Sequence, residues 1–474
     1  MAIWWMTEAV PIPVTSLLPL VAFPLAGVLS YQEAAAPYAN HLIFLFMGGF
    51  FIAKTMERSG LHRRLALKIV VAVGTEPRRL VLGVMLATAL LSMWIPNTAV
   101  AVMMLPIGMA LIGEFRQQTN REVNHVNAEI GHGVTTTAPT GDSTELPGSS
   151  DHGIDELGIA LMLGIAYSAS IGGVATLIGT PPNLVFASMA EELVGGQIDF
   201  IAWMGVGLPI SAVLLPAAWY YLTHIACAVP KKGSLGRDFM QQQLQDLGRM
   251  SRSETAAATI FGITAVALVL RSEKQIGDLV IPGLQTFFPM VGDATIVMTA
   301  AIAAFCVPLS LRKLEFALDW ETGRDIRWGI LILFGGGLSL AEAFQSSGLS
   351  ASIANSVNRF EGAPEWVIVL ASTSIIIFLT EMTSNTGTAT LLMPLYASIA
   401  LGLSIHPYVL MASGALAASM AFMLPVATPP NAIVYGSGMV TIPKMVRVGF
   451  VMNISAIIAT MLAAFFLIPR FLIS

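Results

Sequence analysis

Two short polar stretches interrupt long apolar segments of the chain, and their residue types could bind ions. The first runs from Ser92 to Thr98 and the second from Thr380 to Thr388. Each contains an Asn-Thr pair, and Asn97 and Asn385 are 288 positions apart. Hydroxyl and amide oxygens suit a small hard cation, while the amides at the start of a helix attract an anion. Two copies of one polar break predict two halves of one binding site.

A second kind of break also occurs twice. Gly179-Thr180-Pro181-Pro182-Asn183 returns as Ala427-Thr428-Pro429-Pro430-Asn431, 248 positions later. Paired prolines donate no backbone hydrogen bond, so they hold the chain open. One Asn-Thr pair in a membrane helix is more often an interhelical hydrogen-bonding pair, and one Thr-Pro-Pro is more often a kink. The recurrence of both features favours a site. None of the breaks carries Lys or Arg, so a bound anion would be neutralised by dipoles and co-bound cations.

The composition is that of a membrane protein. Of 474 residues, 55% are hydrophobic and 11% charged, against about 25% charged in an average soluble protein. Mean hydropathy is +0.74, and several apolar runs approach the ~20 residues that cross a bilayer. We expect an all-α polytopic membrane protein. An enzyme would need a nucleophile–base pair or a metal cluster within the spans, and His41 and His224 are too isolated to form one.

The apolar runs predict an order of helices. We expect membrane spans at about 9–28, 38–57, 158–190, 200–227, 254–271, 294–311, 328–345, 407–436 and 445–470. Two further segments, at about 79–114 and 366–401, are too interrupted for one spanning helix and are predicted to be re-entrant helical hairpins.

An internal repeat supports a two-fold architecture. Residues 45–61 match residues 333–349 at the same offset of 288, with eight of the 17 positions identical. The smaller offset of 248 at the second breaks locates an insertion in the first half, predicted as a polar flexible loop at about 115–157. The predicted division is therefore as follows: first repeat 1–229, linker 230–253 and second repeat 254–474. The helix at 254–271 has no counterpart in the first repeat, which indicates a truncated N-terminus or an asymmetric fold.

The number of predicted spans and the charges of the loops predict how the chain is oriented in the membrane. Five predicted spans separate the two hairpins, so the hairpins enter from opposite faces and the repeat is inverted. Lys and Arg gather in the loops of one face, which the positive-inside rule places in the cytoplasm. The first hairpin then enters from the cytoplasm and the second from outside. We expect the cell's inner (plasma) membrane, with the linker 230–253 cytoplasmic and the C-terminus outside.

The chain resembles the divalent anion:Na⁺ symporter family, which includes dicarboxylate, citrate and sulfate carriers. The resemblance covers nearly the whole chain. It is carried by Trp4-Trp5-Met6-Thr7-Glu8-Ala9, by Ser384-Asn385-Thr386 and by the two Thr-Pro-Pro-Asn motifs at 180–183 and 428–431. It implies homodimers with a static scaffold and a transport domain that moves as an elevator. Trp4 and Trp5 suit a membrane interface, and we read Glu8 as an interfacial residue as well.

The resemblance also implies a set of site residues. Those expected at the substrate are Asn97, Thr98, Asn385, Thr386, Thr180, Pro181, Thr428 and Pro429. One Na⁺ is expected near Ser92, Asn97 and Gly179, and a second near Thr380, Ser384, Asn385 and Ala427. The first signature reads Pro96-Asn97-Thr98, so its serine hydroxyl is missing, and the first Na⁺ is expected to use Ser92 and carbonyls or to bind more weakly. Glu381 is left with two roles, a cation or proton site and a structural hydrogen bond.

We therefore predict secondary active transport in which Na⁺ drives uptake of a divalent anion, foremost a C4-dicarboxylate such as succinate, malate or fumarate. The predicted partners are this anion, Na⁺, membrane lipid and a second copy of the chain, with no nucleic acid. Three alternatives remain open: a sodium-independent dicarboxylate exchanger, a Na⁺-coupled citrate carrier and a Na⁺-coupled sulfate carrier.

Overall fold

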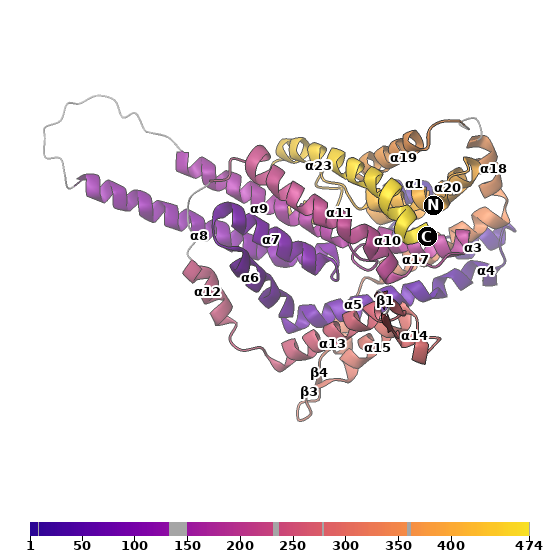
Figure 1. Cartoon of the computed structure of the whole chain (residues 1–474), viewed down its shortest axis with the longest axis horizontal. Coiled ribbons are helices and arrows are strands. Elements are labelled where there is room, and N and C mark those ends of the chain that lie inside the picture. The colour runs from indigo at the N-terminus through magenta and orange to yellow at the C-terminus, as the bar shows by residue number, and fades with distance from the viewer. Residues whose placement is uncertain (8, 132–148, 231–236, 277–278, 358–361, 474) are drawn as a thin grey trace.

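The computed structural model describes residues 1–7, 9–131, 149–230, 237–276, 279–357 and 362–473, and in these ranges it is almost wholly helical (Figure 1). The described strands form two short antiparallel pairs, β1 (Lys274–Ile276) with β2 (Leu279–Ile281) and β3 (Pro308–Ser310) with β4 (Glu315–Phe316). Seven of the described helices are long and apolar enough to cross a membrane. The predicted all-α polytopic class is confirmed.

The elements of the first half, up to residue 229, follow one another along the chain. They are α1 (Ala2–Thr7), α2 (Ile12–Thr15), α3 (Pro19–Leu25), α4 (Tyr31–Ala35), a 3₁₀ turn (Ala36–Ala39), α5 (His41–Ser59), α6 (Leu61–Val73), α7 (Pro77–Ser92), α8 (Asn97–Gly131), α9 (Ser149–Gly173), α10 (Pro181–Val194) and α11 (Phe200–Tyr221), which continues as a π-helical turn (Leu222–Ala226).

The rest of the chain continues with linker helix α12 and the second half. Its helices are α12 (Arg237–Asp246), α13 (Arg252–Val269), α14 (Leu284–Phe287), α15 (Asp293–Cys306), α16 (Trp320–Gly323), α17 (Trp328–Ser346), α18 (Leu349–Val357), α19 (Glu365–Thr380), α20 (Asn385–Gly402), α21 (Pro407–Ala418), α22 (Pro429–Tyr435) and α23 (Ile442–Leu462), followed by π-helical turns at Ala463–Leu467 and Pro469–Ile473.

The helix bounds of the two halves follow the offsets read from the sequence. Helices α7 and α19 differ by 288 at both ends, and α8 and α20 begin at the two signature asparagines. Helices α10 and α22 begin at prolines 248 positions apart. Both hairpins therefore have the predicted form of two helices joined by a short polar turn. The opposite orientation of the halves in a membrane stays a prediction.

Two of the predicted spans are wrong in detail, and two others are broken. The first, at 9–28, is divided into α2 and α3, because prolines recur through this stretch and each removes a backbone donor. The spans at 158–190 and 407–436 are each broken at the predicted Thr-Pro-Pro motif, since α9 ends at Gly173 before α10 begins at Pro181, and α21 ends at Ala418 before α22 begins at Pro429. The span at 294–311 ends early, because α15 stops at Cys306 and the chain turns into β3 and β4.

The polar insertion at 115–157 is not a loop throughout. Helix α8 continues to Gly131 and α9 begins at Ser149. The extension of α8 is polar but contains no proline and many good helix formers, such as Glu, Gln and Arg, so polarity alone misled the prediction. Residues 132–148 lie outside the described part. The linker 230–253 likewise contains α12, and 231–236 lie outside the described residues.

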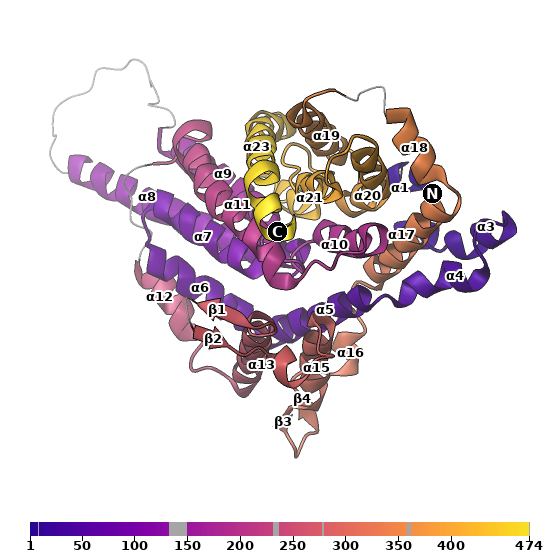
Figure 2. The same cartoon turned by 45° about the vertical axis from the view of Figure 1, so that its right-hand side comes forward.

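The helices form two groups (Figure 2). Helix α5 runs below the bundle that contains α9, α11, α19, α20, α21 and α23, and α13 and α15 lie beneath α5 and pack against it. Within the bundle the two halves interlock. Helix α10 packs against α20 and α21, and α22 packs against α8 and α9. The broken helix of each half therefore docks on the hairpin of the other half, so all four breaks are held in one body.

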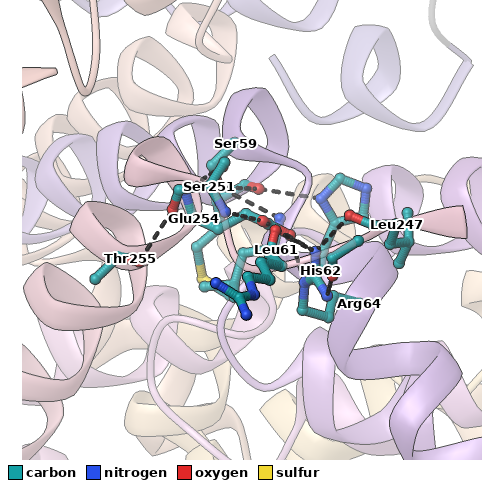
Figure 3. Close-up of polar contacts among 11 residues, drawn as sticks. Ser59, Leu61, His62, Arg64, Leu247, Ser251, Glu254 and Thr255 are labelled. Carbon is teal, nitrogen blue, oxygen red and sulfur yellow. Dashed lines mark hydrogen bonds and ion pairs between the residues drawn. The ribbon is translucent and has the colours of Figure 1, made fainter. Parts of the chain in front are cut away.

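A buried ion pair joins the end of the linker to α6 and α13 (Figure 3). Arg64 in α6 is only 6% exposed. Its Nε and Nη2 donate to the Glu254 carboxylate at 2.7 and 3.2 Å, and its Nη1 and Nη2 also donate to the carbonyls of Gly248 and Leu247. Glu254 also accepts from the Ser251 backbone amide, which closes the capping box of α13. One guanidinium thus joins α6, the end of the linker and the start of α13.

We expect Arg64→Leu to lower the stability of the whole protein. The change leaves the Glu254 carboxylate buried without its partner, a loss of about 3–5 kcal/mol. Thermal unfolding of the detergent-purified protein measures it. The neighbouring Arg63 is exposed, so Arg63→Leu is the matched control and should unfold at the wild-type temperature. Removing Glu254 as well, by Arg64→Leu with Glu254→Leu, should recover most of the loss. Equal unfolding temperatures for Arg64→Leu and Arg63→Leu would contradict this role.

Candidate functional site

The two hairpin turns and the two Thr-Pro-Pro breaks surround one cavity of about 660 Å³. Asn97 begins α8 and Asn385 begins α20, so each lies where a helix presents its N-terminal amides. The structure brings together all of the residues expected at the substrate, and each of them lines the cavity: Asn97, Thr98, Thr180, Pro181, Asn385, Thr386, Thr428 and Pro429. Gly179, Ser384 and Ala427, expected near Na⁺, line it too.

The hydroxyls that end the first helix of each hairpin lie behind the cavity. Both Ser92 and Thr380 are fully buried. Ser92 Oγ lies 2.6 Å from Asn97 Oδ1 and 2.7 Å from the Ala169 carbonyl. Thr380 Oγ1 lies 2.8 Å from Asn385 Oδ1 and 3.3 Å from the Ala418 carbonyl. A hydroxyl carries one proton and each of these lies against two oxygens. Both hairpins therefore gather three oxygens at the point where the signature asparagine begins its helix.

Glycines allow the first cluster to form. A Cβ on Gly179 would collide with the Gly173 carbonyl, and a Cβ on Gly173 would collide with the Asn97 side chain. The break at 174–180 can fold against the hairpin turn only because both positions lack a side chain. The three residues expected at the first Na⁺, Ser92, Asn97 and Gly179, are thus brought into one small region.

The two hairpin turns differ at one position, as the sequence indicates. Ser384 Oγ accepts from the Gly387 amide at 3.4 Å and so caps α20. Pro96 stands at the corresponding place before α8 and offers no side-chain oxygen. The contact between Ser92 and Asn97 is retained all the same.

The asparagine after each proline pair holds its break open. Asn183 Nδ2 donates to the carbonyls of Thr176 at 2.7 Å and Gly173 at 3.2 Å. In the other half, Asn431 Nδ2 donates to Leu424 at 3.0 Å and Ala421 at 3.2 Å. In the described part of the chain, the Oδ1 atoms of both asparagines are buried without a hydrogen-bond partner. These side chains replace the helical hydrogen bonds that the breaks forgo.

Of the two roles predicted for Glu381, this conformation shows the structural hydrogen bond. It is 3% exposed and is not among the residues that line the cavity. Its carboxylate accepts from the backbone amides of 422–424 at 2.8–3.1 Å and from Asn453 Nδ2 at 2.7 Å. The first half has Met93 at the corresponding position, whose carbonyl accepts from the Thr176 hydroxyl. Among the described residues, a carboxylate therefore satisfies the break of the second half, whereas a hydroxyl and a carbonyl meet at the equivalent place in the first.

The sequence-based prediction missed one feature of this region and was wrong about another. Arg327, just before α17, lines the cavity, although none of the breaks carries a basic residue; in the sequence it reads as an ordinary loop cation. Trp5 is 1% exposed and its Nε1 donates to Ser16 Oγ at 3.1 Å, so its prediction as a membrane-interface residue is wrong. Helix α1 packs against α20 instead. Glu8 lies outside the described residues.

Comparison with known proteins agrees with this geometry. The citrate transporter family model matches residues 2–415. The chain is similar to the sodium-dependent dicarboxylate transporters SdcS of Staphylococcus saprophyticus (40% identical) and of Staphylococcus aureus strain MRSA252 (36%), in each case over 99% of this chain and 84% of the relative. It shares its fold with the YdaH transporter of Alcanivorax borkumensis, with a TM-score of 0.53, 13% identity, and coverage of 94% of this chain and 88% of that one. The matched family and these relatives are transporters, not enzymes.

Proposed function

We propose that this chain, which belongs to the divalent anion:Na⁺ symporter family, carries a small dicarboxylate across the membrane together with Na⁺. The observation that carries the proposal is the single cavity that both Asn-Thr turns line. The preferred substrate is a C4-dicarboxylate such as succinate, malate or fumarate. An anion with two carboxylates matches a cavity that two polar helix starts enter from two separate hairpins.

Each carboxylate has its own set of donors in this proposal. Asn97 and Thr98 bind one carboxylate through their side chains and the amides at the start of α8, and Asn385 and Thr386 bind the other at the start of α20. The Thr-Pro-Pro breaks shape the remaining walls with Thr180, Pro181, Thr428 and Pro429. Prolines begin α10 and α22 and remove amides there, so the hairpin turns are the main anion donors.

Two Na⁺ ions bind at the oxygen clusters behind the turns. The first is held by Ser92, Asn97 and the Gly179 carbonyl, and the second by Thr380, Ser384, Asn385 and the Ala427 carbonyl. The support is the crowding of oxygens, because in each cluster one hydroxyl proton faces two acceptors at 2.6–3.3 Å, and oxygens so arranged suit a small cation. Na⁺ also supplies the positive charge that the turns lack, so anion and cation favour each other's binding.

The motion is of the elevator type. The interlocked body of hairpins and broken helices moves against a scaffold that includes α5, α13, α15 and α17. Helices α5, α13 and α15 pack on one another, and α17 packs both on α5 and on α10 and α20 of the moving body. The chain works as a homodimer in the lipid of the cell's inner (plasma) membrane. Its repeats, 1–229 and 254–474, are inverted. The linker 230–253 is cytoplasmic and the C-terminus lies outside.

Uptake of labelled succinate into proteoliposomes tests the proposal. With an inward Na⁺ gradient, we expect succinate to accumulate above its outside concentration, because the gradient does the work. Replacing Na⁺ by K⁺ on both sides should abolish accumulation. Counterflow of preloaded succinate at the same rate without Na⁺ would contradict symport and favour an exchanger. Competition by unlabelled citrate or sulfate that exceeds competition by malate would contradict the C4 preference.

A further inference from the structure

Among the described residues that line the candidate cavity, Arg327 is the one with a cationic side chain. It is half-buried and occupies the N-cap position of α17, without a side-chain capping hydrogen bond. In the described part of the chain its guanidinium has no hydrogen bond to a side chain or carbonyl and no ion pair within 4.0 Å. The carboxylate that acts on it from a distance is Glu57, whose own ion-pair partner is Lys54 at 3.1 Å.

An unpaired guanidinium in a half-buried place is costly, because a charge that leaves water needs a partner. Burial lowers the pKa of Arg327 below its usual range, although an arginine stays charged at any physiological pH. Arg58, at the same end of the scaffold, is fully paired: it contacts Asp319 at 2.6 Å and donates to the Phe316 carbonyl. Arg327 is therefore distinguished by facing the cavity without a protein anion.

The place of Arg327 in the fold suggests when it acts. It belongs to α17 and to none of the four breaks, and its neighbours on the cavity wall are Pro13, Gly329 and Ile330. Pro13 packs directly against Gly329. We assign this wall to the scaffold because α17 is the repeat counterpart of α5, within one residue of the offset of 288, and packs on it. The loop before α17 carries Arg312, Lys313 and Arg324, and the positive-inside rule puts it in the cytoplasm. If the hairpin body moves outward, the Asn-Thr turns leave Arg327 behind.

We propose that Arg327 is a specificity-determining residue on the cytoplasmic side of the cavity, where it binds one carboxylate of the dicarboxylate in the inward-facing state. This rests on the proposed function. A guanidinium matches a carboxylate with two parallel N–H···O bonds. The Asn-Thr turns offer only dipoles, so Arg327 adds one fixed positive charge to those that the co-bound Na⁺ ions supply. It favours a dianion over a monoanion, and it acts on one face of the membrane only.

Transport from each face tests this inference. Inverted membrane vesicles expose the cytoplasmic side and right-side-out vesicles expose the other, and both measure the half-saturating succinate concentration with Na⁺ present. We expect Arg327→Gln to raise this concentration about tenfold or more from the cytoplasmic side, as for the loss of a charged hydrogen-bonded pair. From outside we expect a change below about twofold. Arg327→Lys keeps the positive charge but loses the two parallel N–H donors of the guanidinium. Its half-saturating concentration should lie between those of the wild type and Arg327→Gln.

Arg324→Gln is the matched control, since Arg324 is an exposed neighbour that does not line the cavity; it should leave both values unchanged. If the wild type transports succinate and Arg327→Gln has the same half-saturating concentration from the cytoplasmic side, this inference is overturned and the proposed function is not. Equal weakening from both faces would overturn the cytoplasmic assignment. A wild-type protein that moves no dicarboxylate from either side would overturn the proposed function as well. Size-exclusion elution as for the wild type shows that each variant is folded.

Discussion

Asn385→Ala should abolish succinate uptake and leave the protein folded. Asn385 lines the cavity, begins α20 and holds its Oδ1 2.8 Å from the Thr380 hydroxyl. The change removes an anion donor and a cation ligand together. Because each charged hydrogen-bonded contact contributes about 1.5–3 kcal/mol, we expect the initial rate in proteoliposomes to fall by about a hundredfold or more. The same loss is expected for Asn97→Ala, at the other hairpin.

Asn355→Ala provides the comparison for this loss. Asn355 is exposed on α18 and does not line the cavity, so the same change of residue type should leave uptake at the wild-type rate. Monodisperse elution on size exclusion separates lost transport from lost folding. Wild-type uptake by Asn385→Ala would remove this residue from the site.

Glu381→Ala should cost more stability than any other single change to the polar interior of the hairpin body. The Glu381 carboxylate is the acceptor for three consecutive backbone amides, 422–424, and for the Asn453 amide. Each buried donor left without a partner costs about 1–3 kcal/mol, so the total reaches several kcal/mol. We expect little folded protein after detergent extraction, and a strongly lowered unfolding temperature in what remains.

Glu381→Gln separates charge from hydrogen bonding. Both carboxylate oxygens accept in the native protein. The amide of glutamine keeps one acceptor oxygen, but its NH₂ group then faces backbone N–H groups, which are donors as well. The unfolding temperature should therefore fall between those of the wild type and the alanine variant. Glu365 is exposed at the start of α19, the helix that ends just before Glu381; it is the control, and Glu365→Gln should unfold as the wild type does. If the two glutamine variants unfold alike, the break does not depend on Glu381.

The repeated motifs explain how much of the site could be predicted. Asn97 and Asn385 define helix starts through local chemistry, so a break with its flanking apolar runs could be placed within a few residues. The residues implied by the family resemblance also line one cavity. Ser92 and Thr380 were expected beside the ions and lie one layer behind the cavity, in contact with the signature asparagines.

What could not be predicted depends on contacts between distant segments. No periodicity shows that α10 docks on α20 and α22 on α8, and this exchange is what joins the two halves. Arg327 looks the same in the sequence as the solvated cations before it, because only the fold directs it to the cavity. The helical extension of α8 and the burial of Trp5 were hidden for the same reason: local polarity and residue type do not report packing partners.

The central claim is that both hairpin turns and Na⁺ form one dicarboxylate site. Equilibrium binding of succinate to the purified protein, by calorimetry with Na⁺ and with K⁺ in its place, tests it most directly. We predict at least about tenfold tighter succinate binding in Na⁺, and an equal tightening of Na⁺ binding by succinate, since linkage is reciprocal. Asn97→Ala and Asn385→Ala should each abolish binding. Equal succinate affinity in Na⁺ and K⁺, or wild-type affinity in either variant, would contradict the account.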